Sequence, residues 1–227
     1  IFQSEFGFPI IMHASLDQQA NLELADIGVL QPIRLAGWVR AVPEDVETAF
    51  KFVPDIRHLN LSISTSEQMI NGKFRGKMSR DDVLKMMVDA VETARACGAE
   101  SIGVNAEDAS RADLNFLIEF ALAAKEHGAQ RFRYCDTVGY DNPFTIYETT
   151  RALAENVGIP IETHCHGDLG MAVANSVAGA KGAIDGGQDV YINTTVNGIG
   201  ERAGNADLVA TILAVTESKG FSGKYQL

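Results

Sequence analysis

Residues 101–107 read Ser-Ile-Gly-Val-Asn-Ala-Glu, and this stretch decides between the folds open to the chain. Successive side chains of a β-strand point to opposite faces. Here the apolar side chains share one face and the polar ones share the other, with Ile102, Val104 and Ala106 set against Ser101, Asn105 and Glu107. Central strands of an open parallel sheet are covered on both faces and read as continuous apolar runs. The alternation therefore indicates a strand that packs against helices on one face only.

The same unit, a short β-rich run followed by a helical run, repeats along the chain. We expect seven strands, over Phe2–Phe8, Ile33–Arg40, His58–Thr65, Ser101–Glu107, Arg131–Thr137, Pro160–His166 and Val190–Asn197. The clearest helical patterns lie between them, over Ser79–Ala96, Arg111–Glu126, Pro143–Glu155, Leu169–Ile184 and Ala206–Thr216. Strands that alternate with helices pair in parallel through right-handed crossovers.

Two α/β architectures fit this order of elements: an open, doubly wound sheet and a (β/α)8 TIM barrel. A barrel explains the alternation, because its apolar strand faces meet the helical ring while the polar faces line the interior. Such a barrel has eight strands, and seven are visible. We therefore expect a single catalytic barrel domain over residues 1–227, with the first βα unit missing from the chain as given and no C-terminal regulatory domain.

Composition narrows the class of protein further. The 227 residues are 46% hydrophobic and carry a formal net charge of -11. That charge argues against a nucleic-acid partner or an anionic membrane surface, and no apolar run reaches the roughly 20 residues of a membrane span. Three scattered cysteines, Cys97, Cys135 and Cys165, indicate reduced core thiols, as in a cytoplasmic protein.

His164-Cys165-His166 is the sharpest chemical signal in the sequence, and it ends the predicted strand Pro160–His166. Residues i and i+2 of a strand project from the same face, about 6.7 Å apart along the backbone. Two imidazoles at that spacing can converge on one cation. Active sites of barrels lie at the carboxyl ends of the strands, so we predict that His164 and His166 are metal ligands. Cys165 points the other way, towards the helices.

Two further clusters follow strand ends. Residues 197–205 read Asn-Gly-Ile-Gly-Glu-Arg-Ala-Gly-Asn, a glycine-rich loop that could approach a ligand closely. Its spacing does not match the dinucleotide-binding pattern. Glu107, Asp108 and Arg111 cluster after another strand, and Thr137 points inward after the next. Other polar residues of the inner faces are candidate substrate-binding residues: Glu5, Arg40, Asn60, Ser64 and Asn105.

These motifs together resemble one enzyme family. The strings HCHGDLG at 164–170 and NGIGERAGN at 197–205, with EDASRAD at 107–113, DTVG at 136–139 and EFGFP at 5–9, resemble homocitrate synthase and 2-isopropylmalate synthase. These enzymes belong to the metal-dependent barrels related to HMG-CoA lyase. EDASRAD is most similar to the homocitrate synthases of nitrogen-fixing bacteria.

The resemblance implies an acyltransferase that condenses acetyl-CoA with a 2-oxo acid, 2-oxoglutarate to homocitrate first, by a metal-assisted Claisen condensation followed by thioester hydrolysis. It implies that Asn205 lies near or on the divalent metal, with Mg, Mn, Zn, Fe and Co all permitted by the ligands. Glu107 and Thr137 would line the acceptor site, and Gly198 and Gly200 would lie near the acyl-CoA. We expect a homodimer.

Two departures from the family pattern leave alternatives open. Gly167 stands where the family usually has Asn, and nothing matches the Arg-Asp-Gly-Glu-Gln string that supplies the family's catalytic Arg and a metal carboxylate. The general base is therefore unassigned. The alternatives are an isopropylmalate or citramalate synthase, a lyase or aldolase running the reverse chemistry, and a barrel subunit without catalysis.

Overall fold

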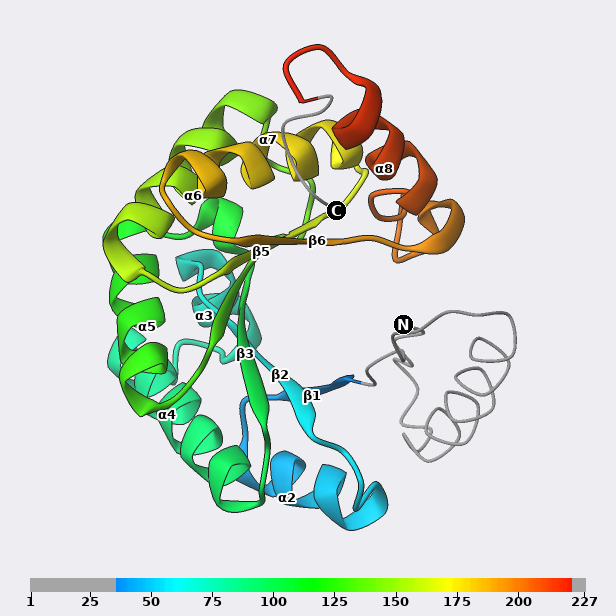
Figure 1. Ribbon diagram of the computed structural model, residues 1–227. Helices are drawn as coiled ribbons and strands as arrows, with labels where there is room; N and C mark the ends of the chain where they lie inside the picture. The colour runs from blue at the N-terminus through cyan, green and yellow to red at the C-terminus, as the bar shows by residue number, and fades with distance from the viewer. Residues whose placement is uncertain (1–35, 222–227) are drawn as a thin grey trace, which may run out of the picture.

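Six parallel strands form one sheet in the order in which they occur in the chain (Figure 1). The computed structural model describes residues 36–221, and the predicted strand Phe2–Phe8 lies outside this range. The strands are β1 Ala36–Arg40, β2 His58–Ser64, β3 Ser101–Glu107, β4 Arg131–Asp136, β5 Ile161–Cys165 and β6 Val190–Asn193. Each pairs in parallel with the next, which is the order that a (β/α)8 barrel requires.

Helices connect successive strands and lie along one side of the curved sheet (Figure 1). They are α2 Pro43–Phe52, α3 Glu67–Lys73, α4 Arg80–Ala96, α5 Leu114–His127, α6 Pro143–Val157, α7 Ala172–Asp185 and α8 Leu208–Glu217. Two short 3-10 turns, Ala109–Arg111 and Val196–Gly198, follow β3 and β6. The α/β class and the barrel arrangement predicted from the strand alternation are confirmed.

The hydrophobic core lies between the strands and the helices. Leu59, Leu61, Val104, Phe132 and Ile161, all on the apolar strand faces, are fully buried. Phe120 of α5 packs edge-to-face on Phe132, with ring centroids 6.3 Å apart, the geometry that aromatic quadrupoles favour. The polar faces consequently point to the inner side of the sheet, where the candidate site residues lie.

Three helix starts show how local chemistry sets element boundaries. Ser79 caps α4 through a reciprocal pair of hydrogen bonds with Asp82. α5 begins at Leu114 rather than at Arg111, because Asp113 accepts the amide of Phe116 and caps the helix there. α7 begins at Ala172 rather than at Leu169.

The late start of α7 and the early end of β6 have backbone causes. Gly170 has φ +74°, a left-handed conformation outside the α-helical region, and its amide donates to the carbonyl of Gly167. β6 ends at Asn193 rather than at Asn197. Beyond it Thr195 pairs with the following loop, donating its amide to the carbonyl of Ala206 and accepting the amide of Leu208, and Asn197 has φ 57° inside a 3-10 turn, outside the β region.

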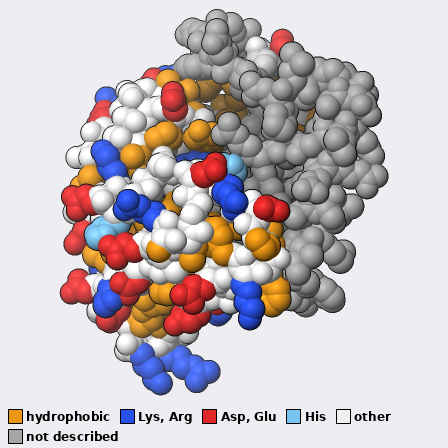
Figure 2. Space-filling model, turned by 60° about the horizontal axis from the view of Figure 1, so that its bottom comes forward, with side chains coloured by type: hydrophobic (Ala, Val, Ile, Leu, Met, Phe, Trp, Pro, Cys, Tyr) orange, Lys and Arg blue, Asp and Glu red, His pale blue; other side chains and the backbone are white. Residues whose placement is uncertain are grey.

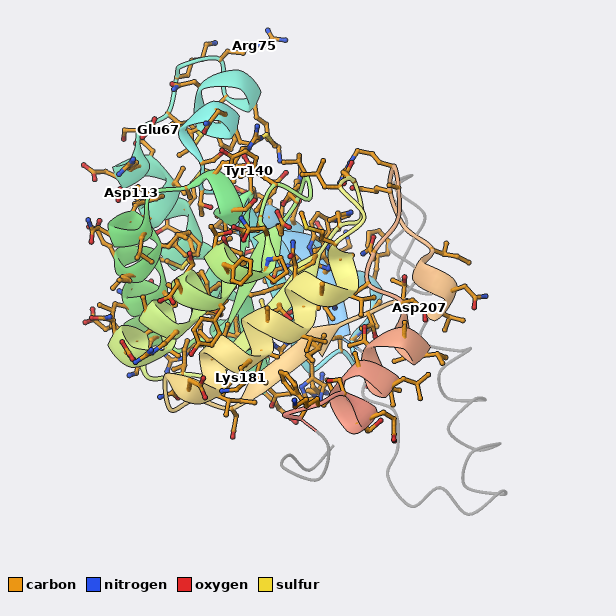
Figure 3. All side chains as sticks on the ribbon, turned by 90° about the horizontal axis from the view of Figure 1, so that it is seen from above. Glu67, Arg75, Asp113, Tyr140, Lys181 and Asp207 are labelled. Atoms are coloured by element: carbon orange, nitrogen blue, oxygen red, sulfur yellow. The ribbon has the colours of Figure 1, made fainter. Side chains whose placement is uncertain are left out.

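The outer surface carries no large single-sign region in the view of Figure 2, where acidic and basic side chains are interspersed. α3 projects beyond the carboxyl end of β2, and Arg75 lies in the turn that follows it (Figure 3). Within residues 36–221, no helix is both long and apolar enough to cross a membrane.

Candidate functional site

The carboxyl ends of β3, β4 and β5 bring the predicted site residues to one edge of the sheet. The amide of Asp108 donates to Thr137 Oγ1 at 2.8 Å, which ties the end of β3 to the end of β4. The amide of His166 donates to the carbonyl of Asp136, which ties β4 to β5. The loop after β6 joins this edge through a bridge between His166 and Asn205. The mouth of the barrel is thus assembled from four segments distant in sequence.

His164 and His166 point towards each other from the inner face of β5. Their Nε2 atoms are 3.1 Å apart, and the rings meet edge-on with centroids 4.9 Å apart. Burial, with Arg133 and His166 nearby, lowers the pKa of His164 to about 4. Burial and Arg202 also lower the pKa of His166. Both imidazoles are therefore neutral at physiological pH and can act as metal ligands.

The protonation of His164 is set by its neighbours. His164 Nδ1 lies 2.8 Å from Asn193 Oδ1, and Asn193 Nδ2 donates to Glu162 Oε1 at 3.2 Å. A carboxylate only accepts, so the Asn193 amide must turn its NH2 to Glu162 and its oxygen to His164. His164 therefore carries its hydrogen on Nδ1 and presents a lone pair at Nε2.

The two Nε2 atoms fit a shared cation. Nitrogens each about 2.1 Å from one ion lie about 3.0 Å apart at a right angle and about 3.4 Å apart at the tetrahedral angle, which brackets the separation found here. Asn205 bridges to His166 through its backbone, and its Oδ1 is buried with no hydrogen-bond partner, as expected of an oxygen that awaits a ligand. Among residues 36–221, no group of three or more His, Cys, Asp or Glu side chains is placed to hold a metal.

The glycine-rich loop is shaped around Asn205. A Cβ at Gly200 would lie 1.9 Å from Asn205 Oδ1, and one at Gly204 would lie 2.2 Å from the carbonyl of Gly198. Gly198 adopts φ +65°, and its carbonyl accepts the amide of Asn205. The predicted reason for these glycines was close approach to a ligand. In the structure these glycines make room for groups of the loop itself, the carboxamide of Asn205 and the carbonyl of Gly198.

Glu107, at the carboxyl end of β3, is held by two partners. Its Oε2 accepts from Ser64 Oγ and from Lys73 Nζ, each at 2.7 Å. The side chain is 23% exposed, so it lies at the mouth of the barrel rather than beneath it. Strand register places Ser64 directly beside Glu107. The contact of Lys73 with Glu107 was not predicted. Lys73 lies at the end of α3, and this helix is too short to show a clear helical pattern in the sequence.

Asp108 points the opposite way and has a structural role. It is fully buried and adopts a left-handed backbone with φ 62°. Its carboxylate accepts two hydrogen bonds from Arg111 Nε, at 2.9 and 3.0 Å, and one from Nη2 at 2.7 Å. It also accepts the hydroxyl of Ser66. These contacts fasten the start of α3 to the turn after β3.

Arg202 fastens the glycine-rich loop to the ends of two strands. Its guanidinium bonds both carboxylate oxygens of Asp168, at 2.8 and 3.1 Å, and donates to the carbonyl of Thr137. This ion pair lowers the pKa of the Asp168 carboxyl. A Cβ at Gly167 would meet the carbonyl of Ala203 at 3.3 Å, so the small residue there lets the same loop pack closely.

The remaining predicted substrate-binding residues occupy different environments. Arg40 is exposed and pairs with Asp45 at the start of α2. Asn60 is buried and accepts from Arg131 Nη2 at 2.8 Å. Asn105 is buried with Oδ1 unpartnered, and Glu5 lies outside the described residues.

An ionic network below the histidines was not predicted. Glu162 lies between Arg131 and Arg133, with N–O distances of 2.7 and 2.6 Å. The alternation placed Arg133, Glu162 and Asn193 on inner faces, and that was the available signal. Their pairing follows from strand register, with Arg133 beside Glu162 and His164 beside Asn193.

The cysteines are free thiols, as predicted, but they are not all in the core. Cys165 is fully buried on the helix side of β5, and Cys135 is also buried. Cys97, at the end of α4, is half-buried. Burial raises the pKa of Cys135 to about 12 and raises that of Cys165 as well.

Comparison with known proteins matches residues 5–227 to the family model described as HMGL-like. The chain is 67% identical to the citrate (Re)-synthase of Dehalococcoides mccartyi over its whole length, which covers 55% of that relative. It is 37% identical to homocitrate synthase 1 of a Nostoc species, over 93% of the chain and 52% of the relative. The chain thus spans about half the length of the curated relatives it matches.

A solved structure shares the fold. HMG-CoA lyase of Bacillus subtilis superposes with a TM-score of 0.66 at 19% identity, over 84% of this chain and 65% of that one. At this identity the likeness concerns the fold alone.

Proposed function

The chain belongs to the HMGL-like family, and from this premise we propose that it is the barrel domain of an acyltransferase. It condenses acetyl-CoA with a dicarboxylic 2-oxo acid and then hydrolyses the thioester. The observation that carries the proposal is the pair of neutral imidazoles, His164 and His166, whose Nε2 atoms face each other at the barrel mouth beside Asn205.

We propose oxaloacetate as the oxo acid and citrate as the product, because the relative at 67% identity is a citrate (Re)-synthase. The second candidate is 2-oxoglutarate, giving homocitrate, on the strength of the EDASRAD string at 107–113 and the homocitrate synthase at 37% identity. Both acids carry a second carboxylate. A pocket distinguishes them by length and by a few polar contacts.

In this proposal His164, His166 and Asn205 would hold a divalent cation, which would supply Lewis-acid polarisation of the carbonyl of the 2-oxo acid. A base takes a proton from the methyl group of acetyl-CoA, and the methyl carbon forms a bond to C2 while the electron pair of the carbonyl bond moves to its oxygen, which takes up a proton. Water then cleaves the thioester to release CoA thiol. The side chains of the barrel mouth bind and orient the two substrates for this bond.

Thr137 and Glu107 act on the acceptor acid. Thr137 Oγ1 already accepts the amide of Asp108, so its own hydrogen is directed elsewhere and can bond a substrate carboxylate. Glu107 is fixed by Ser64 and Lys73, which preorganises it before substrate arrives. Gly198 and Gly200 have no side chains, so the loop can lie close to the acyl group. Arg40, Ser64, Asn105 and Glu5 remain candidates for substrate contact, and Asn60 contributes through Arg131.

The test is a thiol-release assay on the full-length protein with acetyl-CoA and each of four acids: oxaloacetate, 2-oxoglutarate, 2-oxoisovalerate and pyruvate. We expect CoA thiol with oxaloacetate at the highest kcat/KM. Faster release with 2-oxoglutarate would select homocitrate synthesis. Release with none of the four, together with cleavage of a hydroxyacyl-CoA, would replace the synthase by a lyase. Sedimentation of the same protein tests the expected homodimer.

A further inference from the structure

We propose that Asn193, oriented by Glu162, is a positioning residue that fixes His164 in the tautomer required for binding the cation. The inference rests on the proposed metal site and adds to it a residue from a different strand. It accounts for a buried carboxylate and a half-buried amide below the site that the reaction itself does not use.

The chain of hydrogen bonds has only one consistent direction. Glu162 accepts from Asn193 Nδ2 at 3.2 Å, so Asn193 Oδ1 faces His164 Nδ1 at 2.8 Å. The oxygen cannot donate, so the hydrogen lies on Nδ1. The lone pair of His164 therefore sits at Nε2, on the side of His166. Metal-ligating histidines commonly have their second nitrogen fixed in this way.

Glu162 is in turn held so that it cannot rotate away. Its two oxygens are bound by Arg131 and Arg133 from the neighbouring strand, and its side chain is only 7% exposed. Arg131 continues across the glycine of β3 to Asn60 on β2. A Cβ at Gly103 would lie 2.5 Å from Asn60 Oδ1 and 3.2 Å from the Arg131 guanidinium. The missing side chain at 103 is what lets the network cross β3.

The network therefore links four strands to a single ring nitrogen. β2 contributes Asn60, β4 the two arginines, β5 Glu162 and β6 Asn193. A tautomer fixed by so many strands is set before the cation arrives, and the cation then meets a lone pair that needs no proton transfer at His164. Loss of Asn193 would leave Nδ1 and Nε2 to compete for the hydrogen.

The first experiment reads the tautomer directly. Long-range 1H–15N correlation spectra of the metal-free, full-length protein distinguish the Nδ1–H and Nε2–H forms of His164. We expect the Nδ1–H form in the native protein and a mixture in Asn193→Leu. If Asn193→Leu does not fold, Asn193→Ala takes its place. A pure Nδ1–H form in the Leu or Ala variant would overturn the inference.

The second experiment measures Co²⁺ affinity by calorimetry. We expect Asn193→Leu to bind Co²⁺ about 10- to 100-fold more weakly, the usual cost of losing such a partner. Unchanged affinity in Asn193→Leu would contradict the inference. Failure of the native protein to bind Co²⁺ would instead contradict the proposed metal site, so the two failures are distinguishable.

Tyr191→Leu is the matched control. Tyr191 lies on the same strand and the same face as Asn193, and its ring packs on the Arg131 guanidinium at 5.1 Å. The substitution disturbs the same network at its far end without touching His164. We expect the His164 tautomer and the Co²⁺ affinity to be unchanged in this variant. A tautomer mixture there would show that general loosening of the network, rather than Asn193, sets the ring.

Discussion

The ends of β3 and β5 lie on the same edge of the sheet, yet they differ in whether their polar side chains have partners within the protein. At the end of β3, Glu107 already has two partners, Ser64 and Lys73, at normal hydrogen-bond distances. At the end of β5, two neutral imidazoles turn nitrogens towards each other, and Asn205 Oδ1 and His166 Nδ1 are buried without partners. Buried polar atoms are normally paired.

This difference shows which part of the site has all its hydrogen-bond partners without a bound ligand. The β3 end is organised by its own ion pair and needs no ligand to hold its shape. At the β5 end the two imidazoles have only each other at Nε2, and Asn205 Oδ1 has no partner, so a cation would give these atoms a common partner. We therefore expect substitutions at the β5 end to weaken metal binding, and substitutions at the β3 end to lower turnover or stability.

The largest effect is expected at β5. His164→Ala and His166→Ala should each weaken Co²⁺ binding by at least about 100-fold in the full-length protein, since each removes one of the facing nitrogens. Circular dichroism should show the fold retained. Native-like affinity in both variants, measured by calorimetry, would remove the basis for the comparison.

Glu107→Gln should lower turnover by at least about tenfold, roughly 1.4 kcal/mol of transition-state stabilisation. The substitution keeps the size of the side chain and removes the charge that faces Lys73. Metal affinity and the unfolding midpoint should stay near native values. Glu67→Gln is the control, because Glu67 on α3 is an exposed partner of Arg80 (Figure 3). Equal rates for the two variants would deny Glu107 a role in the reaction.

Asp108→Asn should lower stability by about 1 kcal/mol while leaving turnover close to native. The carboxylate of Asp108 anchors Arg111 at 2.7 Å. Asn suits the left-handed backbone but loses charge-assisted bonds to Arg111 and keeps only one acceptor oxygen. Urea unfolding measures the change. A midpoint equal to that of the native protein would contradict the assignment.

The smallest effect concerns the faces of β5. Cys165 lies between the two histidines but points to the helices and is fully buried. Its raised pKa, like that of Cys135, keeps the thiol protonated at pH 8, and the thiolate is the reactive form. A thiol reagent at pH 8 should therefore label Cys97 well before the other two. Early labelling of Cys165, read by mass spectrometry, would mean that the strand faces are reversed.

Much of the fold follows from alternation within single strands. Ser101–Glu107 forms β3 with the predicted bounds, and Leu59, Leu61 and Val104 are buried on the predicted face. The convergence of His164 and His166 also follows from spacing alone, because residues two apart on a strand share a face.

Contacts between strands could not be read in the same way. Asn193 meets His164, and Arg133 meets Glu162, through the register of neighbouring strands, which no single strand encodes. Lys73 reaches Glu107 from a short helix that only capping by Ser66 defines. The late start of α7 depended on the left-handed backbone at Gly170. Each of these features is set by tertiary packing or by turn chemistry rather than by periodicity.

The most direct test of the account is an X-ray absorption spectrum of the full-length protein loaded with Zn²⁺. We expect scattering from two imidazole ligands at about 2.0–2.1 Å from the metal, and from one imidazole ligand in His164→Ala. A native spectrum without imidazole scattering, or one that His164→Ala leaves unchanged, would contradict the claim that the β5 end is the metal centre.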